Sequence, residues 1–294
     1  LICCFLWGSA FPVVKIGYRM FSIGASDTAS QILFAGIRFT LAGILVILFG
    51  SLASRKLLLP RRSALVPIGL LSLAQTILQY FFFYIGLANT TGVKSSIINA
   101  SSTFFAILMS SLLFRYEKLT RVKLLGCAAG FAGVILINLA GGSFDFHMRL
   151  TGEGFILIAA LSYALSSVLV KKFSARENPV MLSGWQFILG GLILAAGGAA
   201  MGGRVSGFTI PSSLLLLYMA MISAVAYSLW GILLKYNPVS RIAVFGFMNP
   251  VFGVILSALL LGENNQAFSL YGLAALILVS LGIFLVNRRD TSVS

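Results

Sequence analysis

Long apolar runs separated by short polar stretches occupy almost the whole chain. A helix needs about 20 predominantly apolar residues to cross the hydrocarbon of a bilayer. The pattern therefore predicts an all-α integral membrane protein with ten transmembrane helices. The ten runs lie near residues 1–21, 31–53, 64–88, 92–114, 120–140, 152–173, 178–201, 212–235, 239–261 and 267–287.

Short motifs recur between the first five runs and the last five. Gly36–Phe39 (GIRF) recurs as Gly184–Phe187 (GWQF), and Glu117, just past an apolar run, has Glu263 as its counterpart. An odd number of helices per copy makes the two copies face opposite ways, so we expect Glu117 and Glu263 at opposite membrane faces. Such inverted five-helix repeats are typical of secondary transporters, whose substrate site lies between the halves near the midplane.

The boundaries of the repeats follow from the spacing of the runs. A weaker match pairs Trp7–Lys15 with Tyr163–Lys171, and a polar linker starts at Gly141 in the middle of the chain. The sequence thus divides into a first repeat, a linker, a second repeat and a cytoplasmic tail, with expected bounds 1–141, 142–151, 152–289 and 290–294.

Lys and Arg gather in alternate loops. One set of loops, with the C-terminal end, carries fifteen of these residues, and the other set carries four. Cytoplasmic loops of membrane proteins hold an excess of Lys and Arg. We therefore expect the rich loops and both chain ends in the cytoplasm. The rich loops lie near residues 55–62, 115–123, 171–176 and 235–241.

Composition agrees with a lipid environment. The chain is 59% hydrophobic and 10% charged, with mean hydropathy +1.01, whereas soluble domains carry about 25% charged residues. A net charge of +14 would suit nucleic acid, but the charges lie in short clusters between apolar runs rather than on one basic face. The expected surroundings are a lipid bilayer, and no nucleic-acid partner is expected.

Motifs for enzymatic or metal chemistry are missing from the sequence. Cys3, Cys4 and Cys127 lie in apolar runs without the spacing of a zinc site or a disulfide framework. The stretch Gly92–Ser95 lacks the glycine spacing of a phosphate loop, and there is no nucleophile elbow. We expect no enzymatic activity, no cofactor and no metal.

Polar and aromatic side chains lie deep in several predicted helices. An unpaired amide or indole in hydrocarbon costs a few kcal/mol, so such groups should face the bundle interior or a wet cavity. The alternative is that Tyr and Trp belong to interfacial aromatic belts, but their depth favours a central cavity. The residues expected to line it and bind substrate are Trp7, Gln79, Tyr80, Phe83, Tyr84, Asn99, Thr103, Tyr163, Tyr227, Trp230 and Asn249.

Two prolines lie within predicted helices. Proline lacks a backbone donor and bends a helix, so Pro12 and Pro250 are candidate hinge or kink positions, with a kink used only for packing as the alternative. Two basic residues, Lys15 and Arg38, lie inside helix ends. Both are expected near the outer face, where Asp27 or Glu263 neutralises them or Lys15 snorkels to the interface.

Acidic residues and histidine are missing from the middle of every predicted span. A proton relay in a membrane usually employs such groups. The sequence therefore favours transport without obligatory proton movement, in which substrate moves down its own gradient or exchanges for another substrate.

Several fragments together resemble the drug/metabolite transporter superfamily, in particular its ten-helix members built from two EamA-type repeats. They are Leu6–Phe11 (LWGSAF), Arg38–Phe39, the two glutamate motifs and Asn249–Pro250, although Thr103 is followed by Phe104 where Pro is common. The resemblance covers essentially the whole chain. Within the superfamily the chain is similar to the YddG group of bacterial amino-acid exporters.

This resemblance implies export of neutral or aromatic amino acids, or related small metabolites, across the bacterial inner membrane by alternating access. The resemblance also favours proton-driven export, against the absence of mid-span acids. We expect a single chain to be sufficient for transport, and the sequence leaves the oligomeric state open. A multidrug cation exporter is the main alternative, but it would be expected to carry an acidic residue within a span. An integral membrane enzyme or lipid-handling protein is a remote alternative without a visible catalytic constellation.

Overall fold

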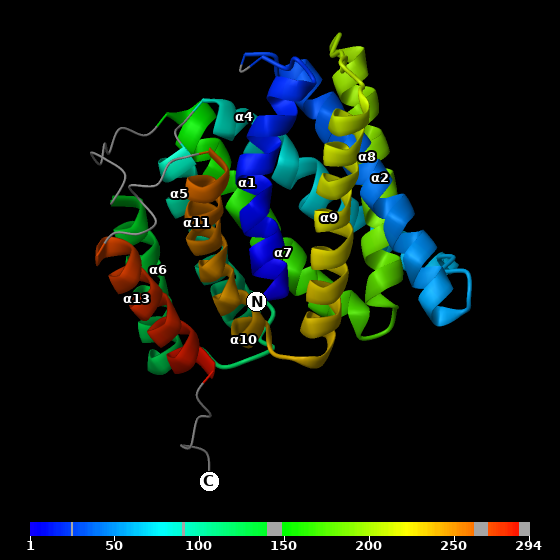
Figure 1. Ribbon diagram of the computed structural model, residues 1–294. Helices are drawn as coiled ribbons and strands as arrows, with labels where there is room; N and C mark the ends of the chain where they lie inside the picture. The colour runs from blue at the N-terminus through cyan, green and yellow to red at the C-terminus, as the bar shows by residue number, and fades with distance from the viewer. Residues whose placement is uncertain (25, 90–91, 140–148, 262–269, 288–294) are drawn as a thin grey trace.

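The computed structural model describes residues 1–294 except 25, 90–91, 140–148, 262–269 and 288–294 (Figure 1). The described residues are helical, without strands, in agreement with the predicted all-α class. The first repeat holds α1 (Ile2–Met20), α2 (Thr28–Ser54), α3 (Leu65–Leu71) continued by α4 (Gln79–Ala88), α5 (Gly92–Leu108) and α6 (Arg121–Leu139). The second holds α7 (Phe155–Ser174), α8 (Pro179–Ala200), α9 (Ile210–Tyr236), α10 (Val239–Ala243) continued by α11 (Met248–Leu261), and α13 (Leu270–Asn287).

These helices form ten spans, as the apolar runs predict. Five helical stretches are both long and apolar enough to cross a membrane on their own, and shorter apolar helices lie in the fourth, ninth and tenth spans. Each repeat contributes five spans, so the protein has the fold of an inverted-repeat membrane protein.

Some spans are not continuous α-helices. In the third span, the π-helical segment Ser72–Leu78 separates α3 from α4. In the ninth, the 3₁₀ segment Val244–Phe247 separates α10 from α11. Further π-helical turns end the fourth span at Met109–Leu113 and begin the sixth at Leu150–Gly154. Short π and 3₁₀ stretches within helices are frequent near functional sites.

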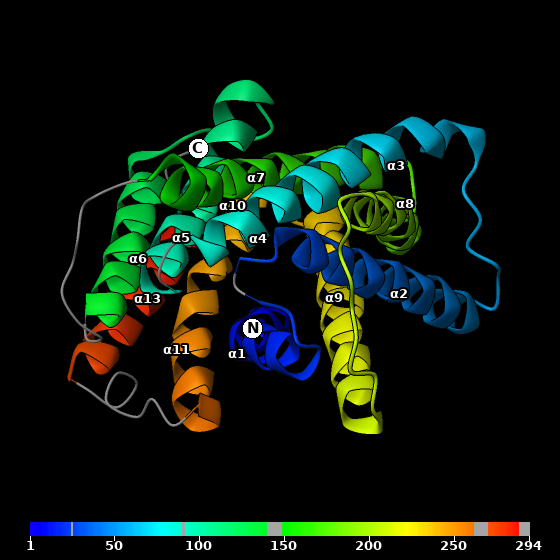
Figure 2. The same ribbon diagram turned by 90° about the horizontal axis from the view of Figure 1, so that it is seen from above.

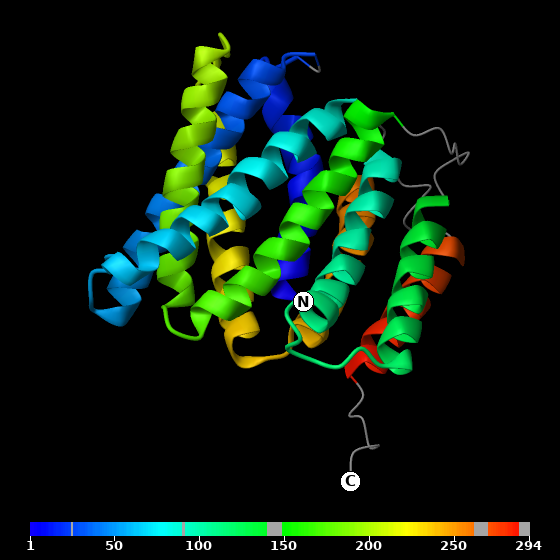
Figure 3. The ribbon, with the colours of Figure 1, turned by 180° about the vertical axis from the view of Figure 1, so that it is seen from behind.

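The Lys- and Arg-rich connections all lie at one end of the molecule, hereafter the basic end, which is the lower end in Figure 1. The start of α1 and the end of α13 lie at the same end. Helices α1, α4 and α8 end at the opposite end, and Figure 3 shows the same division from behind. Consecutive spans therefore alternate in direction.

The two glutamate motifs follow the expected inversion as far as the structure describes them. Glu117 lies in the connection between α5 and α6, at the basic end. Helix α11, which precedes the second motif, ends at Leu261 on the opposite end of the molecule (Figure 1). Glu263 itself lies outside the described residues, as do most of the predicted linker and the predicted tail.

Helices α2 and α8 occupy matching positions in the two repeats and pack closely against each other, as glycine-lined helices of membrane proteins do. A Cβ atom on Gly36 would lie 2.2 Å from the backbone nitrogen of Ala195, and one on Gly191 would lie 2.5 Å from that of Thr40. We call this contact the glycine seam. Figure 2 shows α2 beside α8 when the molecule is viewed from above.

The seam also brings together residues that the repeat places in equivalent positions. The rings of Phe39 and Phe187, the last residues of the two GIRF and GWQF motifs, stack with centroids 5.3 Å apart. This ring pair belongs to one of two apolar clusters, and the other cluster contains Phe247. Trp7 packs against both clusters. The packing is therefore organised around the boundary between the repeats.

Both predicted hinge prolines lie in helices. Pro12 is in the interior of α1, which continues on both sides of it. Pro250 is the third residue of α11, directly after the 3₁₀ segment. The first turn of a helix has no intrahelical partner for its backbone N–H groups, so proline is tolerated there.

Candidate functional site

A cavity lies at the boundary between the two repeats, with walls from α1, α2, α4, α5, α7, α9 and α11. Nine of the eleven residues predicted to line it do so: Trp7, Gln79, Tyr80, Phe83, Tyr84, Asn99, Tyr163, Tyr227 and Asn249. The sequence reasoning missed the remaining lining residues, which are Ala10, Val14, Arg38, Leu87 and Ser102.

The polar wall joins the two repeats through hydrogen bonds. Gln79 and Tyr80 are the first residues of α4 after the π-helical segment. The Tyr80 hydroxyl lies 2.6 Å from the Tyr227 hydroxyl on α9, and Gln79 Nε2 donates to the same oxygen at 3.5 Å. These contacts link the third span of one repeat to the third span of the other.

Aromatic side chains close the cavity toward the basic end. The ring of Trp7 makes edge-to-face contacts with Tyr163, Tyr227 and Trp230, at centroid distances of 6.0, 5.0 and 4.9 Å. We call these four residues the aromatic floor. Trp230 is 4% exposed and lies one helical turn beyond Tyr227, beneath the cavity rather than in its wall.

The wall formed by α5 and α11 differs slightly from the prediction. Asn99 and Ser102 line the cavity, but Thr103 does not. Thr103 is buried against the 3₁₀ segment of the ninth span. Its Oγ1 lies so close to Gly246 that a Cβ atom on this glycine would be only 2.7 Å away. Asn249, at the start of α11, lines the cavity as expected.

Arg38 is the charged residue in the cavity wall. Its side chain is 4% exposed and donates from Nε to the Met219 carbonyl (3.2 Å), from Nη1 to the Tyr84 hydroxyl (3.3 Å) and from Nη2 to Ser223 Oγ (3.0 Å). The expected partner Asp27 instead accepts from the Ser30 backbone N–H and caps α2. A cation within an apolar run is itself a signal of a functional position.

Three further polar atoms of the wall have no hydrogen-bond partner in the described part of the chain. They are the indole nitrogen of Trp7, Oε1 of Gln79 and Oδ1 of Asn249. Buried polar groups are nearly always hydrogen-bonded, so each of these buried atoms lacks a partner that a bound molecule would supply. Among the described residues, no group of three or more His, Cys, Asp or Glu is placed to hold a metal ion.

The cavity extends from the floor away from the basic end. Along α4 its lining runs from Gln79 to Leu87, in the last turn of that helix. Helix α4 ends at the upper end of the molecule in Figure 1. The cavity therefore lies between the aromatic floor and the end that carries few basic residues.

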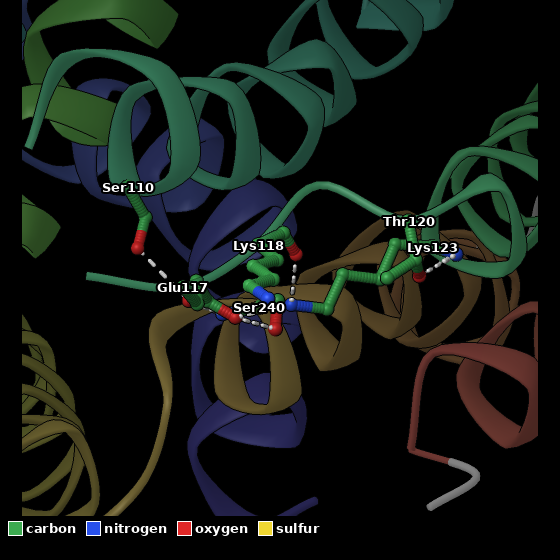
Figure 4. A network of polar contacts seen from close by, with 6 residues as sticks. All are labelled: Ser110, Glu117, Lys118, Thr120, Lys123 and Ser240. Carbon is green, nitrogen blue, oxygen red and sulfur yellow. Dashed lines mark hydrogen bonds and ion pairs between the residues drawn. The ribbon is translucent and has the colours of Figure 1, made fainter. Parts of the chain in front are cut away.

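A polar network around Glu117 lies at the basic end (Figure 4). Glu117 Oε1 accepts from Ser110 Oγ (2.8 Å) and from the Ser240 backbone N–H (3.0 Å), while Oε2 accepts from Lys123 Nζ (2.7 Å) and the Ser240 hydroxyl. Burial raises the pKa of the Glu117 carboxyl, but these hydrogen bonds together outweigh burial and leave the pKa below its ordinary value. The network joins the first repeat to the start of α10 in the second.

Ten helices in two inverted repeats, with a polar and aromatic cavity between them, define a membrane transporter. The sequence profile of the EamA-like transporter family matches residues 1–139 and 150–288. The chain therefore belongs to the EamA-like transporter family, and the predicted resemblance is confirmed.

Proteins that are similar to this chain over nearly its full length are also named as transporters or efflux pumps. The chain is 29% identical over 301 residues to a probable amino-acid metabolite efflux pump of Escherichia coli, covering 98% of this chain and 94% of the relative. It is 27% identical over 297 residues to the uncharacterized inner membrane transporter YedA of the same organism, covering 97% and 90%. A crystal structure with TM-score 0.78 and 18% identity, covering 97% and 94% of the two chains, shares the fold.

Proposed function

We propose that this chain is a secondary transporter that exports neutral or aromatic amino acids, or related small metabolites, by alternating access. The observation that carries the proposal is the composition of the cavity wall, which combines aromatic rings with amide, hydroxyl and guanidinium groups. Ligand sites of this kind bind the apolar part of a small molecule with rings and fix its orientation with a few polar groups. The relatives named as amino-acid metabolite efflux pumps support the same substrate class.

The proposed membrane is the bacterial inner membrane, with the basic end and both chain ends in the cytoplasm, because cytoplasmic loops are rich in Lys and Arg. In this orientation the described cavity extends toward the outside. The aromatic floor and the Glu117 network then close the cytoplasmic side. The conformation corresponds to an outward-facing state, and export requires a second state in which this closure opens.

A multidrug cation exporter fits the cavity less well. The charged group in the cavity wall is the Arg38 guanidinium, and no carboxylate is among the described lining residues. A positive wall repels a cationic drug rather than holding it. Helices of both repeats enclose the cavity, so we propose that a single chain suffices for transport.

Uptake into proteoliposomes tests this function. The purified protein, reconstituted in vesicles, is expected to equilibrate labelled phenylalanine, tryptophan and leucine faster than protein-free vesicles. Excess unlabelled substrate is expected to suppress the signal. Transport of a cationic dye such as ethidium, with no transport of any amino acid, would instead favour the multidrug exporter.

A further inference from the structure

We infer that Arg38 binds the carboxylate of the transported molecule and makes this transporter selective for carboxylate-bearing substrates. The inference rests on the proposed function and deepens it by naming the chemical group that the cavity requires. It draws on the burial of Arg38, its partners and the asymmetry between the repeats.

The first argument is the missing counter-charge. Arg38 is 4% exposed in the interior of a membrane protein, and among the described residues no carboxylate pairs with it. Its hydrogen-bond partners are two hydroxyls and one carbonyl, all neutral. Charges buried in a membrane protein are normally paired, so a bound anion would complete this site.

The second argument is the geometry of the guanidinium. Arginine has five N–H donors in a planar fork, and three of the five are used by the carbonyl of Met219 and the hydroxyls of Tyr84 and Ser223. The partners come from α4 and α9, so both repeats hold the fork in place in the cavity wall. Nη1 and Nη2 each retain one donor, and paired donors of this kind suit a carboxylate.

The third argument compares the two repeats. The residue that matches Arg38 in the second repeat is Gln186, which is fully buried, accepts from Thr76 Oγ1 at 2.5 Å and does not line the cavity. Each residue lies two positions after the first glycine of its motif, Gly36 or Gly184, and the two helices pack against each other across the glycine seam. Since the neutral Gln186 satisfies the packing at one position, the packing alone does not require the positive charge at the other.

The remaining free atoms of the wall suit the other half of an amino acid. Gln79 Oε1 and Asn249 Oδ1 are acceptors without a partner among the described residues. An ammonium group would supply the donor that each of these acceptors lacks, and the aromatic floor would contact an apolar side chain. A cavity with donors at Arg38 and acceptors at Gln79 and Asn249 therefore suits a zwitterion better than an amine.

Competition by substrate analogues tests the inference. Four compounds share one aromatic ring: phenylalanine, phenylalaninamide, phenethylamine and 3-phenylpropanoate. The assay measures how each reduces exchange of labelled phenylalanine by wild-type protein in proteoliposomes. We expect phenylalanine and 3-phenylpropanoate to compete, and the two compounds that lack a carboxylate to compete at least about tenfold more weakly.

Substitutions at Arg38 are then compared with a matched control. Arg38→Gln, which copies the residue of the second repeat, is expected to lose most of the preference for carboxylates. Arg38→Lys keeps the positive charge but not the planar fork of donors, so it is expected to retain part of that preference. Gln186→Met removes the matched polar group outside the cavity and is expected to keep the wild-type preference. If Arg38→Gln does not fold, the analogue series on wild-type protein still tests the inference.

The outcomes separate two failures. Equal competition by phenylalanine and phenylalaninamide in wild-type protein would overturn the role of Arg38 and leave amino-acid transport intact. A full wild-type preference in folded Arg38→Gln would do the same. If wild-type vesicles exchange none of the amino acids in the panel, the proposed function fails, and the inference fails with it.

Discussion

Gln79 lies where the third span changes from π-helical to α-helical hydrogen bonding. A π-helical turn inserts an extra residue and rotates the side chains that follow it. The amide of Gln79 consequently faces the cavity, where Nε2 reaches Tyr227 at the long distance of 3.5 Å and Oε1 has no partner among the described residues. The side chain of Gln79 is therefore expected to contribute little to the stability of the fold.

Replacing Gln79 by Ala is expected to reduce amino-acid exchange severalfold while the melting temperature stays near the wild-type value. The reason is that the substitution removes a wall group that is available to substrate and loses only one weak hydrogen bond. Proteoliposome exchange and a thermal melt in detergent check the two parts. A large fall in melting temperature with unchanged exchange per folded molecule would show that Gln79 is a packing residue.

Trp230 provides the contrast on the repeat-related helix. It is 4% exposed and packs against Trp7 beneath the cavity. Truncation of a buried Trp to Ala typically costs about 3–5 kcal/mol, so Trp230→Ala is expected to lower the melting temperature clearly. The two substitutions distinguish a residue of the wall from a residue of the floor.

Most of the cavity lining was predictable from sequence because amides and aromatic rings are costly in lipid and therefore turn inward. The two residues wrongly placed in the wall show different errors: Trp230 lies one helical turn too far along α9, whereas Thr103 is rotated about the axis of α5. Thr103 is four residues from Asn99 and Ser102 is three, and spacing alone does not decide which of them faces the cavity. Arg38 was expected near an acidic partner at the outer face, and the available signal was the neutral Gln186 at its matched position.

At the scale of elements, the Glu117 network couples the α5–α6 connection to the first turn of α10. Short helices gain stability from acceptors that satisfy their first backbone N–H groups. Here the acceptor of the Ser240 N–H comes from the other repeat. Opening of the basic end in an inward-facing state would have to separate these partners.

The same network predicts a pH dependence of stability. The pKa of Glu117 in the folded protein lies below its ordinary value of 4.5. The ionised carboxylate therefore stabilises the fold at pH values above 4.5, and this contribution is lost as the pH falls through the folded-state pKa. We expect Glu117→Gln to have a lower melting temperature than wild type at pH 7 and a smaller loss on acidification to pH 4. Melting curves in detergent across this range measure both.

Glu177→Gln is a suitable control for this prediction. Glu177 accepts one hydrogen bond from Ser63 at the surface of the same end, so its replacement is expected to leave the pH dependence nearly unchanged. Parallel curves for wild type and Glu117→Gln would contradict the stabilising role of the Glu117 carboxylate.

The elements were predictable from sequence in number and order but not in their internal breaks. Hydropathy reports which residues avoid water, and ten runs of sufficient length appear in it directly. It carries no information on whether a backbone N–H bonds three, four or five residues back. The π-helical segment Ser72–Leu78 and the 3₁₀ segment Val244–Phe247 therefore appear only in the structure.

For the whole molecule, the proposed orientation predicts which loops an external reagent reaches. A cysteine at Ser206, in the α8–α9 connection, is expected to react with a membrane-impermeant maleimide on intact cells, and a cysteine at Lys118 only after permeabilisation. Both positions are exposed. The native cysteines Cys3, Cys4 and Cys127 are buried, so the parent protein serves as the blank. The reverse labelling pattern would place the basic end outside.

Energy coupling is also a property of the whole molecule. Since the described cavity wall contains no Asp, Glu or His, we expect counterflow of phenylalanine at equal pH with a protonophore present. An imposed pH gradient should neither accelerate the exchange nor drive accumulation. Accumulation driven by the gradient would show proton coupling through groups elsewhere in the chain.

The glycine seam restricts how the molecule can change shape. At Gly36 and Gly191 the space for even one methyl group is already filled by the backbone of the opposite helix. A shift of α2 along α8 by one residue, about 1.5 Å, would bring residues with larger side chains to these contact points. Only glycine, which has a hydrogen atom in place of a side chain, fits there. Sliding is therefore blocked, whereas a small rotation about a line through the contact keeps the two backbones together. The seam has the properties of a fulcrum, and the largest displacements should fall on the helices farthest from it.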